Sequence, residues 1–295
     1  VFYAPQYAAM ALGFFADEGL EIDLMNGGGA DKVMTSVLTG EVDIGLAGPE
    51  ACIYVLLEGR RDAPRVFAQL TQCDGSFIVG RQAEDFAWQN LRGKTIIGGR
   101  KGGMPEMTLE YVMRKNGVIP HEDATVDTSV QFNMMAGAFV GGEADYVALF
   151  EPTATEVELA GQGVVLCSIG EQSGEIPYTA YFAAQSYLTE NADTVLRFTR
   201  AIARGQEWVY AHTDRELAEA IVGYFPDTSV EVLEKVAARY KGIRAWKETP
   251  DMKQEALERL ETVMEQAGEL SQRVAYEALV ENEFAYHVMA EMGQK

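Results

Sequence analysis

Strand-like and helix-like segments alternate in short cycles along the first two thirds of the chain, and this alternation constrains the fold most strongly. Strand patterns, with apolar residues alternating or running together, occur at residues 1–4, 20–25, 42–48 and 64–70. Helix patterns follow the first three of these, at residues 5–19, 32–41 and 49–59. Pro5 and Pro49 suit the first turn of a helix. Repeated strand–loop–helix units predict a parallel sheet flanked by helices.

A second set of such units begins after residue 81. Its expected strands are residues 94–99, 124–129 and 145–150, its expected helices are residues 105–117 and 132–142, and residues 158–170 add a short helix and a strand. Residues 177–188 read as an extended stretch that returns the chain to its starting region. The pattern therefore predicts two α/β lobes joined by two crossings of the chain.

From Thr189 onward the pattern is helical. Residues 192–212 carry apolar side chains at helical spacing. Thr213 with Glu216, and Thr228 with Glu231, have the spacing of capping boxes, in which side chains satisfy the free N–H groups of a helix start. Thr249–Pro250 is expected to open a further helix that runs to residue 268. We expect this helical tail to pack mostly on the first lobe.

The chain is strongly acidic and apolar enough to form a large core. Its 295 residues are 47% hydrophobic, and 24 Lys and Arg against 45 Asp and Glu give a formal net charge of −21. Such a charge repels phosphate groups, so we expect no general binding to nucleic acid or anionic lipid. No run approaches the ~18 apolar residues of a membrane helix.

The sequence offers no recognisable catalytic or metal-binding motif. His121, His212 and His287 are scattered and have no metal-ligand spacing, and the G-x-S-x-G motif of hydrolases is absent. The segment at residues 98–103, GGRKGG, lacks the G-K-[ST] ending of a phosphate loop. Three well-separated cysteines show no C-x-x-C spacing and are expected to be buried free thiols. We therefore predict no catalytic residue, no metal and no cofactor.

Distinctive short motifs stand where a strand is followed by a helix. They are Y-A-P-Q, N-G-G-G and G-P-E in the first lobe, and G-G-R-K-G-G-M-P-E, V-Q-F and F-E-P in the second. In open α/β sheets the carboxyl ends of the strands line the crevice in which ligands bind, because free backbone N–H groups of helix starts point there. Six such turns from two lobes predict a binding site between the lobes.

These motifs also carry a resemblance to a known family. Residues 4–24, APQYAAMALGFFADEGLEIDL, and residues 27–50, GGGADKVMTSVLTGEVDIGLAGPE, resemble the solute receptors of ABC transporters. The chain is similar to the branch that takes up sulfonates, nitrate, taurine and thiamine pyrimidine precursors. The segments NLRGKTIIGG and FEPTATE share this resemblance, which extends from Tyr3 to about Tyr187.

The resemblance implies an α/β, two-lobed periplasmic-binding-protein type II fold, each lobe a mostly parallel sheet flanked by helices, with a C-terminal helical tail. Lobe 1 is expected to comprise residues 1–75 and 180–295, and lobe 2 residues 76–179. Such a receptor performs no chemistry; it closes over a small molecule by a hinge motion and docks on a membrane permease. The hinge is expected near Gln72–Ser76 and Pro177–Tyr181.

A ligand favours the closed form only by contacting both lobes, so the expected binding residues come from both lobes and the hinge. They are Tyr3, Gln6, Gly28, Gly48, Pro49, Glu50, Ser76, Gly102, Gly103, Met104, Gln131, Phe132, Phe150, Glu151 and Tyr178. Aromatic rings would stack on a planar ligand, and Gln and Glu would bind its polar edge. Glu50, Glu106 and Glu151 disfavour an anion and suit amino groups or a cationic heterocycle. We therefore favour a planar nitrogen heterocycle such as a thiamine pyrimidine precursor.

Three other hypotheses remain open. The ligand could be a sulfonate, taurine, nitrate or riboflavin. The chain could instead be an enzyme of pyrimidine synthesis on the same fold, although the C-C-C-F-C run of the yeast-type synthases is absent. It could also be the ligand-sensing domain of a regulator. For the receptor we expect an extracytoplasmic monomer, in the periplasm or at the cell surface, anchored as a lipoprotein after removal of a signal peptide that this chain does not include.

Overall fold

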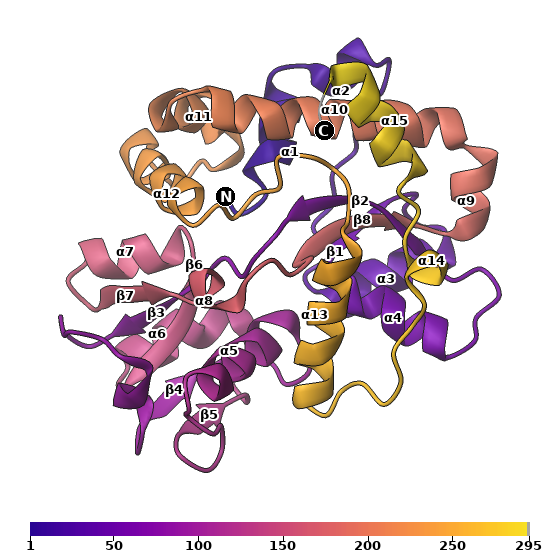
Figure 1. The fold of residues 1–295 in the computed structure, drawn as a ribbon. Coiled ribbons are helices and arrows are strands. Elements are labelled where there is room, and N and C mark those ends of the chain that lie inside the picture. Colours follow the sequence, from indigo (N-terminus) through magenta and orange to yellow (C-terminus); the bar gives the residue numbers. More distant parts are fainter. Residues whose placement is uncertain (294–295) are drawn as a thin grey trace.

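Two separate β-sheets form the centre of the molecule. The computed structural model describes residues 1–293. Strands β1 (Gly45–Ala47), β2 (Arg65–Thr71) and β8 (Thr179–Ala183) make the first sheet, in the order β1-β8-β2. Strands β3 (Ser76–Gly80), β4 (Thr95–Ile97), β5 (Thr125–Asp127), β6 (Tyr146–Phe150) and β7 (Val164–Ser168) make the second, in the order β5-β4-β6-β3-β7. Figure 1 shows the two sheets side by side, linked by two passages of the chain.

The sheets are less parallel than the sequence pattern predicts. In the second sheet β4 runs parallel to β5 and β6, whereas β3 pairs antiparallel with both β6 and β7. In the first sheet β8 is antiparallel to β1 and to β2. The reason is that β8 enters the first sheet on the way back from the second, and it inserts between two strands that run the other way. The extended returning segment was predicted; its direction within the sheet was not.

Helices cover both sheets. Those before β8 are α1 (Ala4–Ala11), α2 (Phe14–Asp17), α3 (Ala30–Thr39), α4 (Glu50–Leu57), α5 (Met104–Lys115), α6 (Met135–Val140), α7 (Thr153–Leu159) and α8 (Gly170–Ser173), with 3₁₀ turns η1 (Trp88–Leu91) and η2 (Phe132–Met134). The tail holds α9 (Gln185–Glu190), α10 (Ala192–Ala211), α11 (Asp214–Ile221), the 3₁₀ turn η3 (Val222–Tyr224), α12 (Val230–Gly242), α13 (Gln254–Gln266), α14 (Tyr276–Leu279) and α15 (Glu283–Met292).

The apolar cores explain why the helices lie on both faces. On one side of the second sheet, Leu109 and Val112 of α5 pack with Ile78, and on the other side Phe139 of α6 packs with Val147. One face of the first sheet packs against α10. The largest core contains residues of α3 and α4, and also residues of the second sheet and of the tail. This shared core joins the two halves at the crossings.

Several predicted elements differ in the structure. Residues 1–4 form a turn and the start of α1, with the Ala4 N–H bonded to the Val1 carbonyl, and residues 20–25 form no strand. Residues 20–25 keep the alternating pattern, but they pair with no neighbouring strand, and Leu24 and Met25 are exposed. The helix expected at 5–19 is divided, because Gly13 adopts the left-handed conformation, with φ 76°.

The helix starts of the tail were predicted in part. Thr213 and Glu216 form the expected capping box at α11. At α12 the N-cap is Ser229, one residue later than predicted, and its hydroxyl accepts the Val232 N–H. Thr249–Pro250 does not open a helix; α13 starts only at Gln254. Residues 247 and 250 instead hydrogen-bond to the backbone of β2, so this stretch is held extended along the sheet. Within residues 1–293 no helix combines the length and apolar character required to span a membrane.

Close packing of α1 on α10 generates a prediction. A Cβ atom added at Gly205 of α10 would lie 2.3 Å from the Pro5 carbonyl oxygen. Gly205→Ala should therefore lower the free energy of unfolding by about 2 kcal/mol, within the usual cost of overpacking, as measured by urea denaturation. Gly223→Ala is the matched control, since a Cβ atom there meets nothing within 4 Å. Equal stability of the two variants would contradict the tight contact between the helices.

Candidate functional site

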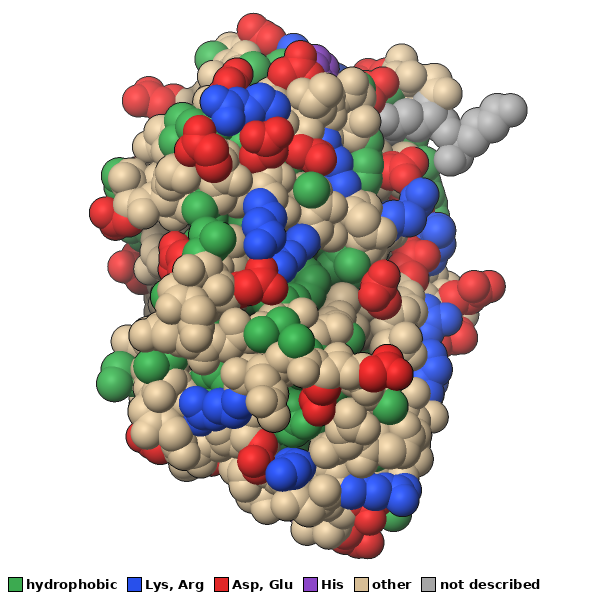
Figure 2. All heavy atoms as spheres, turned by 90° about the vertical axis from the view of Figure 1, so that its left-hand side faces the viewer, with side chains coloured by type: hydrophobic (Ala, Val, Ile, Leu, Met, Phe, Trp, Pro, Cys, Tyr) green, Lys and Arg blue, Asp and Glu red, His purple; other side chains and the backbone are tan. Residues whose placement is uncertain are grey.

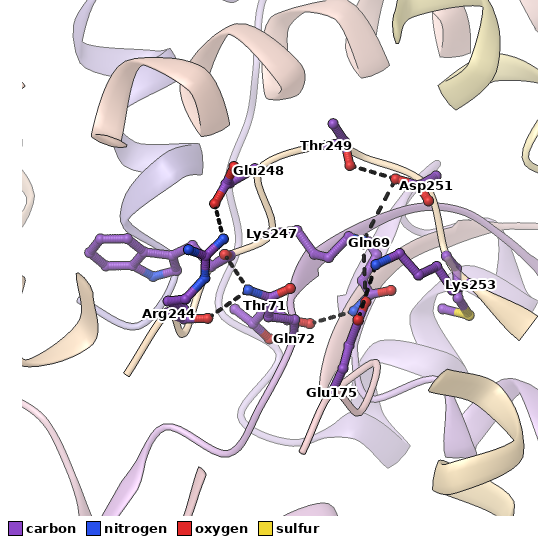
Figure 3. Close-up of polar contacts among 12 residues, drawn as sticks. Gln69, Thr71, Gln72, Glu175, Arg244, Lys247, Glu248, Thr249, Asp251 and Lys253 are labelled. Atoms are coloured by element: carbon purple, nitrogen blue, oxygen red, sulfur yellow. Dashed lines mark hydrogen bonds and ion pairs between the residues drawn. The ribbon is translucent and has the colours of Figure 1, made fainter. Parts of the chain in front are cut away.

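Both crossings between the sheets are attached to one segment of the tail, residues 244–253 (Figure 3). At the first crossing, the Gln72 side-chain amide donates hydrogen bonds to the carbonyl oxygens of Arg244 and Trp246, at 2.8 and 3.2 Å. At the second crossing, Glu175 forms an ion pair of 3.3 Å with Lys247, which is 97% buried. The tail thus holds in place the two passages from which the site is built.

Aromatic side chains from distant parts of the chain meet where the crossings leave the sheets. The ring of Phe2 lies 5.5 Å from Phe150 at the end of β6, 5.7 Å from Tyr178 and 5.2 Å from Tyr240 of α12. Tyr3 is next to it, at 5.6 Å. We call these five residues the aromatic cluster. It brings together three of the residues predicted from the sequence, Tyr3, Phe150 and Tyr178, and adds Phe2 and Tyr240.

Glu50 lies at the start of α4 with its carboxylate buried. The side chain folds back over Gly48, where any Cβ atom would lie 2.0 Å from Glu50 Oε2, so only glycine fits at that position. Pro49 is the N-cap of α4. Glu50 Oε2 has no hydrogen-bond partner, and no ion pair to Glu50 is present within residues 1–293. Burial raises the pKa of Glu50 to about 7, opposed by its own backbone N–H and by the charge of Arg100.

A second buried carboxylate, Asp74, lies in the first crossing. Its Oδ1 accepts hydrogen bonds from the backbone and the hydroxyl of Ser76, and its Oδ2 has no partner. Burial raises the pKa of Asp74 to about 6 in spite of those bonds. The Tyr178 hydroxyl is near enough to lower the pKa of Asp74, although the two groups make no hydrogen bond of normal geometry. Glu50 and Asp74 both raise the pKa of Tyr178, so its hydroxyl lies near both carboxylates.

The start of α5 faces the same region from the second sheet. Gly103 is the N-cap of α5, and Gly102 donates its N–H to Glu106 Oε2 at 3.1 Å. Burial raises the pKa of Tyr54 to about 12, and the charges of Glu50, Glu269 and Glu106 add to this effect. The Tyr54 hydroxyl has no hydrogen-bond partner. Gly102, with φ 74°, leaves room for the Glu269 carboxylate, since a Cβ there would lie 3.3 Å from it. The loop at 102–103 therefore lies close to the Glu50 side of the site.

One group of side chains on α5 has the spacing of metal ligands. Glu106, Glu110 and His121 each place one ligand atom within 4.8 Å of the others. This group was not predicted from the sequence, because His121 reaches α5 from the turn that follows the helix. Glu110 already accepts from His121 Nε2 and from Arg114 Nη2, both at 2.7 Å. Since these protein groups occupy both Glu110 oxygens, we assign no metal to the group.

Glu151 was predicted as a ligand-binding residue, and the structure gives it protein partners instead. Its Oε1 lies 2.7 Å from Arg239 Nη1 of α12, and Thr155 donates to both of its oxygens. Arg239 Nη2 and Lys235 also bind Glu158, so α12 and α7 are joined by a network of ion pairs. Figure 2 looks onto the α12 and α7 side of the molecule and shows acidic and basic side chains together beside a hollow with hydrophobic side chains.

The other predicted residues have different environments. Gln6 Oε1 accepts a hydrogen bond of 2.8 Å from the Tyr181 hydroxyl. Gly28 has a φ of 70° in the loop before α3, and Gln131 is exposed before η2. Phe132 is 63% exposed and its ring lies 5.8 Å from that of Phe150, so it extends the aromatic cluster to the surface. Met104, the first residue of α5, is buried in the shared core.

Sequence reasoning missed Phe2, Tyr54, Asp74, Arg239 and Tyr240. Asp74 is two residues before the predicted Ser76, and an Asp preceding Ser by two positions is a common turn pattern that could have indicated it. Arg239 and Tyr240 lie on an ordinary amphipathic helix, where nothing in the sequence distinguishes them from other surface and core residues.

A surface groove of ≈ 430 Å³ lies elsewhere, between α9, α10 and α15. In its lining, Arg65 pairs with Glu281 at 2.6 Å. It contains no buried carboxylate comparable with Glu50, so we place the candidate site at the aromatic cluster and the two carboxylates.

Comparison with known proteins relates most of the chain to one family. The model of the family described as "NMT1/THI5 like" matches residues 2–216. The candidate binding protein YtlA of Bacillus subtilis (strain 168) is 44% identical over 292 residues, which cover 99% of this chain and 87% of that protein. A Candida albicans (strain WO-1) protein, 4-amino-5-hydroxymethyl-2-methylpyrimidine phosphate synthase, is 24% identical over 237 residues, 74% of this chain and 66% of the enzyme.

The fold recurs in solved structures. The ligand-binding component of an ABC-type import system from Staphylococcus aureus, solved with zinc bound, superposes with a TM-score of 0.76 and 15% sequence identity. The match covers 97% of this chain and 95% of that one. The two-lobed periplasmic-binding-protein fold expected from the sequence resemblance is therefore confirmed.

The ion pair between α12 and α7 generates a prediction about stability. Arg239→Met leaves the fully buried Glu151 carboxylate without its cation, and we expect a loss of about 3 kcal/mol in the free energy of unfolding. Urea denaturation would measure the loss, and Glu151→Met in the Arg239→Met background should recover part of it. Arg215→Met is the control, because the ion pairs of Arg215 are exposed and should contribute little. Similar losses for Arg239→Met and Arg215→Met would contradict the prediction.

Proposed function

We propose that this chain, which belongs to the NMT1/THI5-like family, is the solute-binding receptor of an ABC importer, and that its ligand is a planar nitrogen heterocycle such as a pyrimidine precursor of thiamine. The observation that carries the proposal is the combination of an aromatic cluster with buried oxygens that lack hydrogen-bond donors, at Glu50 and Asp74. A flat ring can stack on the aromatic side chains while its amino groups donate to the carboxylates.

The names of similar proteins support both parts of the proposal. YtlA is named as a binding protein, and the Staphylococcus aureus protein is the ligand-binding component of an import system. The distant Candida albicans relative is named as the synthase of an aminopyrimidine phosphate. A pyrimidine carrying amino groups matches the acceptors of the candidate site.

The same site is unsuited to an anion. A sulfonate or a nitrate entering it would find no cation buried beside the two carboxyl groups, and it would repel either group in its ionised form, strongly so where water is excluded. Arg100, the cation that acts on Glu50, lies on an exposed loop and pairs with Asp31 at 3.5 Å. We therefore rank sulfonate, taurine and nitrate below a heterocycle.

Receptor function implies a motion of two lobes about the crossings. We propose that the lobes comprise residues 1–75 with 180–295, and residues 76–179, as the sequence predicts. The first strand after the second crossing, β8, begins at Thr179, one residue from this boundary. The aromatic cluster takes Tyr3 from the first part and Phe150 from the second, so a ligand stacked there would favour the closed form. The receptor would act outside the cytoplasm as a monomer and deliver its ligand to a permease.

The second candidate function is an enzyme of pyrimidine synthesis, and the Candida albicans relative is the observation that favours it. The thiols of this chain argue against a cysteine nucleophile: burial raises the pKa of Cys52, Cys73 and Cys167, which disfavours their thiolates. Formation of a new pyrimidine by the purified protein would support the enzyme over the receptor.

A thermal-shift panel tests the receptor proposal. At 100 times its dissociation constant, a ligand adds about 2.7 kcal/mol of stability, or roughly 4 °C in Tm for a chain of this length. We expect such a shift with 4-amino-5-hydroxymethyl-2-methylpyrimidine or a related aminopyrimidine, and none with taurine, alkyl sulfonates or nitrate. A shift with the anions alone would retain the receptor and reject the heterocycle. No shift with any member of the panel, which includes thiamine and riboflavin, would count against the proposal.

The exposed ring of Phe132 provides a direct test of stacking. Phe132→Ala should weaken binding of the aminopyrimidine by about five- to tenfold, because a stacked aromatic pair contributes about 1 kcal/mol beyond its buried area. Isothermal titration calorimetry would measure the affinity. Met134→Ala, in the same 3₁₀ turn and 58% exposed, is the matched control and should leave the affinity unchanged. Equal effects of the two substitutions would rule out stacking on Phe132.

A further inference from the structure

Glu50 is a buried carboxylate to which the protein offers no counter-ion. It is 5% exposed, its Oε2 accepts no hydrogen bond, and it takes part in no ion pair among the residues that the structure describes. Among the other buried glutamates, Glu110, Glu151 and Glu261 each pair with an arginine, and Glu106 accepts a hydrogen bond from the Gly102 N–H. The difference indicates that the partner of Glu50 is supplied from outside the protein.

The groups facing Glu50 come from four places in the chain. Their mutual effects on pKa identify them: Tyr3 before α1, Cys52 and Tyr54 on α4 itself, Tyr178 before β8, and Arg100 before α5. Four of these are neutral hydroxyl or thiol groups. The fifth, Arg100, is 64% exposed and bound to Asp31. No cationic group of this set is therefore free and buried beside the carboxylate.

Polar atoms without partners surround the same point. The hydroxyls of Tyr54 and Tyr178 have no hydrogen-bond partner, and neither has Asp74 Oδ2. Burial raises the pKa of Tyr178, and the charges of Asp74 and Glu50 add to this effect, so the Tyr178 hydroxyl shares its surroundings with both carboxyl groups. Buried polar atoms without partners are rare in native proteins, because each costs about 1–3 kcal/mol. A ligand with several N–H donors would satisfy them.

Glu50 also has limited freedom to turn away. Its carboxylate occupies the space above Gly48 that a Cβ atom would otherwise fill, at 2.0 Å from Oε2. The two residues that follow Glu50, Ala51 and Cys52, are buried within the shared core. The carboxylate is thus held at the site before any ligand arrives, and this preorganisation favours binding.

A buried carboxylate without a cation stays neutral by holding a proton, whereas a cation in contact with it favours the ionised form. We infer that the ligand is bound as a cation and that Glu50 selects it: on binding, the Glu50 carboxyl releases its proton to solvent, and the carboxylate accepts a hydrogen bond from a positively charged N–H group of the ligand. The substrate class is then an amidine-like nitrogen base on a flat ring. This inference rests on the proposed function and specifies the charge of the ligand at that site.

The sign of the pH dependence follows. The proton competes with a permanent cation for the same carboxylate, so affinity should fall as the pH decreases below the pKa of Glu50, which burial raises to about 7. At higher pH the carboxyl is already ionised, and the affinity should level off. A neutral ligand of the same shape would lose its contact with Glu50 when the carboxyl group ionises. Its affinity should therefore not rise with pH.

The test uses benzamidine, a permanent cation on a flat ring, and benzamide, its neutral counterpart. Calorimetric titrations of the whole chain at pH 6 and pH 8 should show benzamidine binding about tenfold more tightly at pH 8, and at least tenfold more tightly there than benzamide. At pH 6, titrations in phosphate and in Bis-Tris should give different observed enthalpies, because a proton passes from Glu50 to the buffer. Absence of benzamidine binding at either pH, or equal affinity for the two compounds, would overturn the inference.

The Glu50→Gln variant tests whether Glu50 is the group that selects the cation. This variant should lose the pH dependence and the preference for benzamidine over benzamide, while Glu58→Gln, an exposed change at the end of the same helix, should retain both. A pH dependence that survives Glu50→Gln would reject Glu50 as the selecting group. If Glu50→Gln fails to fold, as judged by circular dichroism, the proton release of the unmodified chain still decides the inference.

The outcomes also separate this inference from the proposed function. An aminopyrimidine that shifts the Tm, together with binding that is independent of pH and of charge, would leave the receptor in place and reject cation selection. No stabilisation by any heterocycle and no benzamidine binding would reject both.

Discussion

The attachment of both crossings to residues 244–253 is the constraint on which the functional region depends. Asp74 lies in the first crossing and Tyr178 in the second, so whatever holds these passages also positions two polar groups of the candidate site. Gln72 and the buried Lys247 supply that attachment, one through backbone carbonyls and the other through an ion pair with Glu175 (Figure 3). A tail that looks peripheral in the sequence therefore holds both crossings in place.

Two glutamates from similar turns of the chain have opposite environments. Glu50 and Glu151 each stand beside a proline at the start of a helix that follows a strand. Glu151 is neutralised by Arg239 and hydrogen-bonded by Thr155, so its charge is already compensated within the protein. Glu50 has no such partner. A buried charge costs several kcal/mol unless it is paired, and this difference distinguishes a structural carboxylate from one suited to a ligand.

Much of the site could be predicted because ligand-binding turns in α/β folds occur at a fixed place, between a strand and the next helix. Tyr3, Glu50 and Phe150 were found in this way, whereas Tyr178 was found in the extended segment that returns the chain to the first sheet; Tyr3, Phe150 and Tyr178 meet in the aromatic cluster. Contacts between residues that are remote in the sequence could not be predicted. Arg239 is 88 residues from Glu151, and its contact depends on how α12 packs against α7. The predictions for the direction of β8 and for a strand at residues 20–25 were wrong for the same reason, because strand pairing depends on segments that are remote in the sequence.

The sequence by itself determined the class of fold, the approximate elements of both sheets, the family and the turns that could bind a ligand, because these follow from periodicity, helix-start residues and local motifs. Only the tertiary structure decided which acidic side chains are buried, which of them are paired, and that Phe2, Tyr240 and Asp74 join the site. Burial and charge pairing depend on segments brought together by folding, and the pKa of a carboxyl group responds to that environment rather than to its neighbours in the chain.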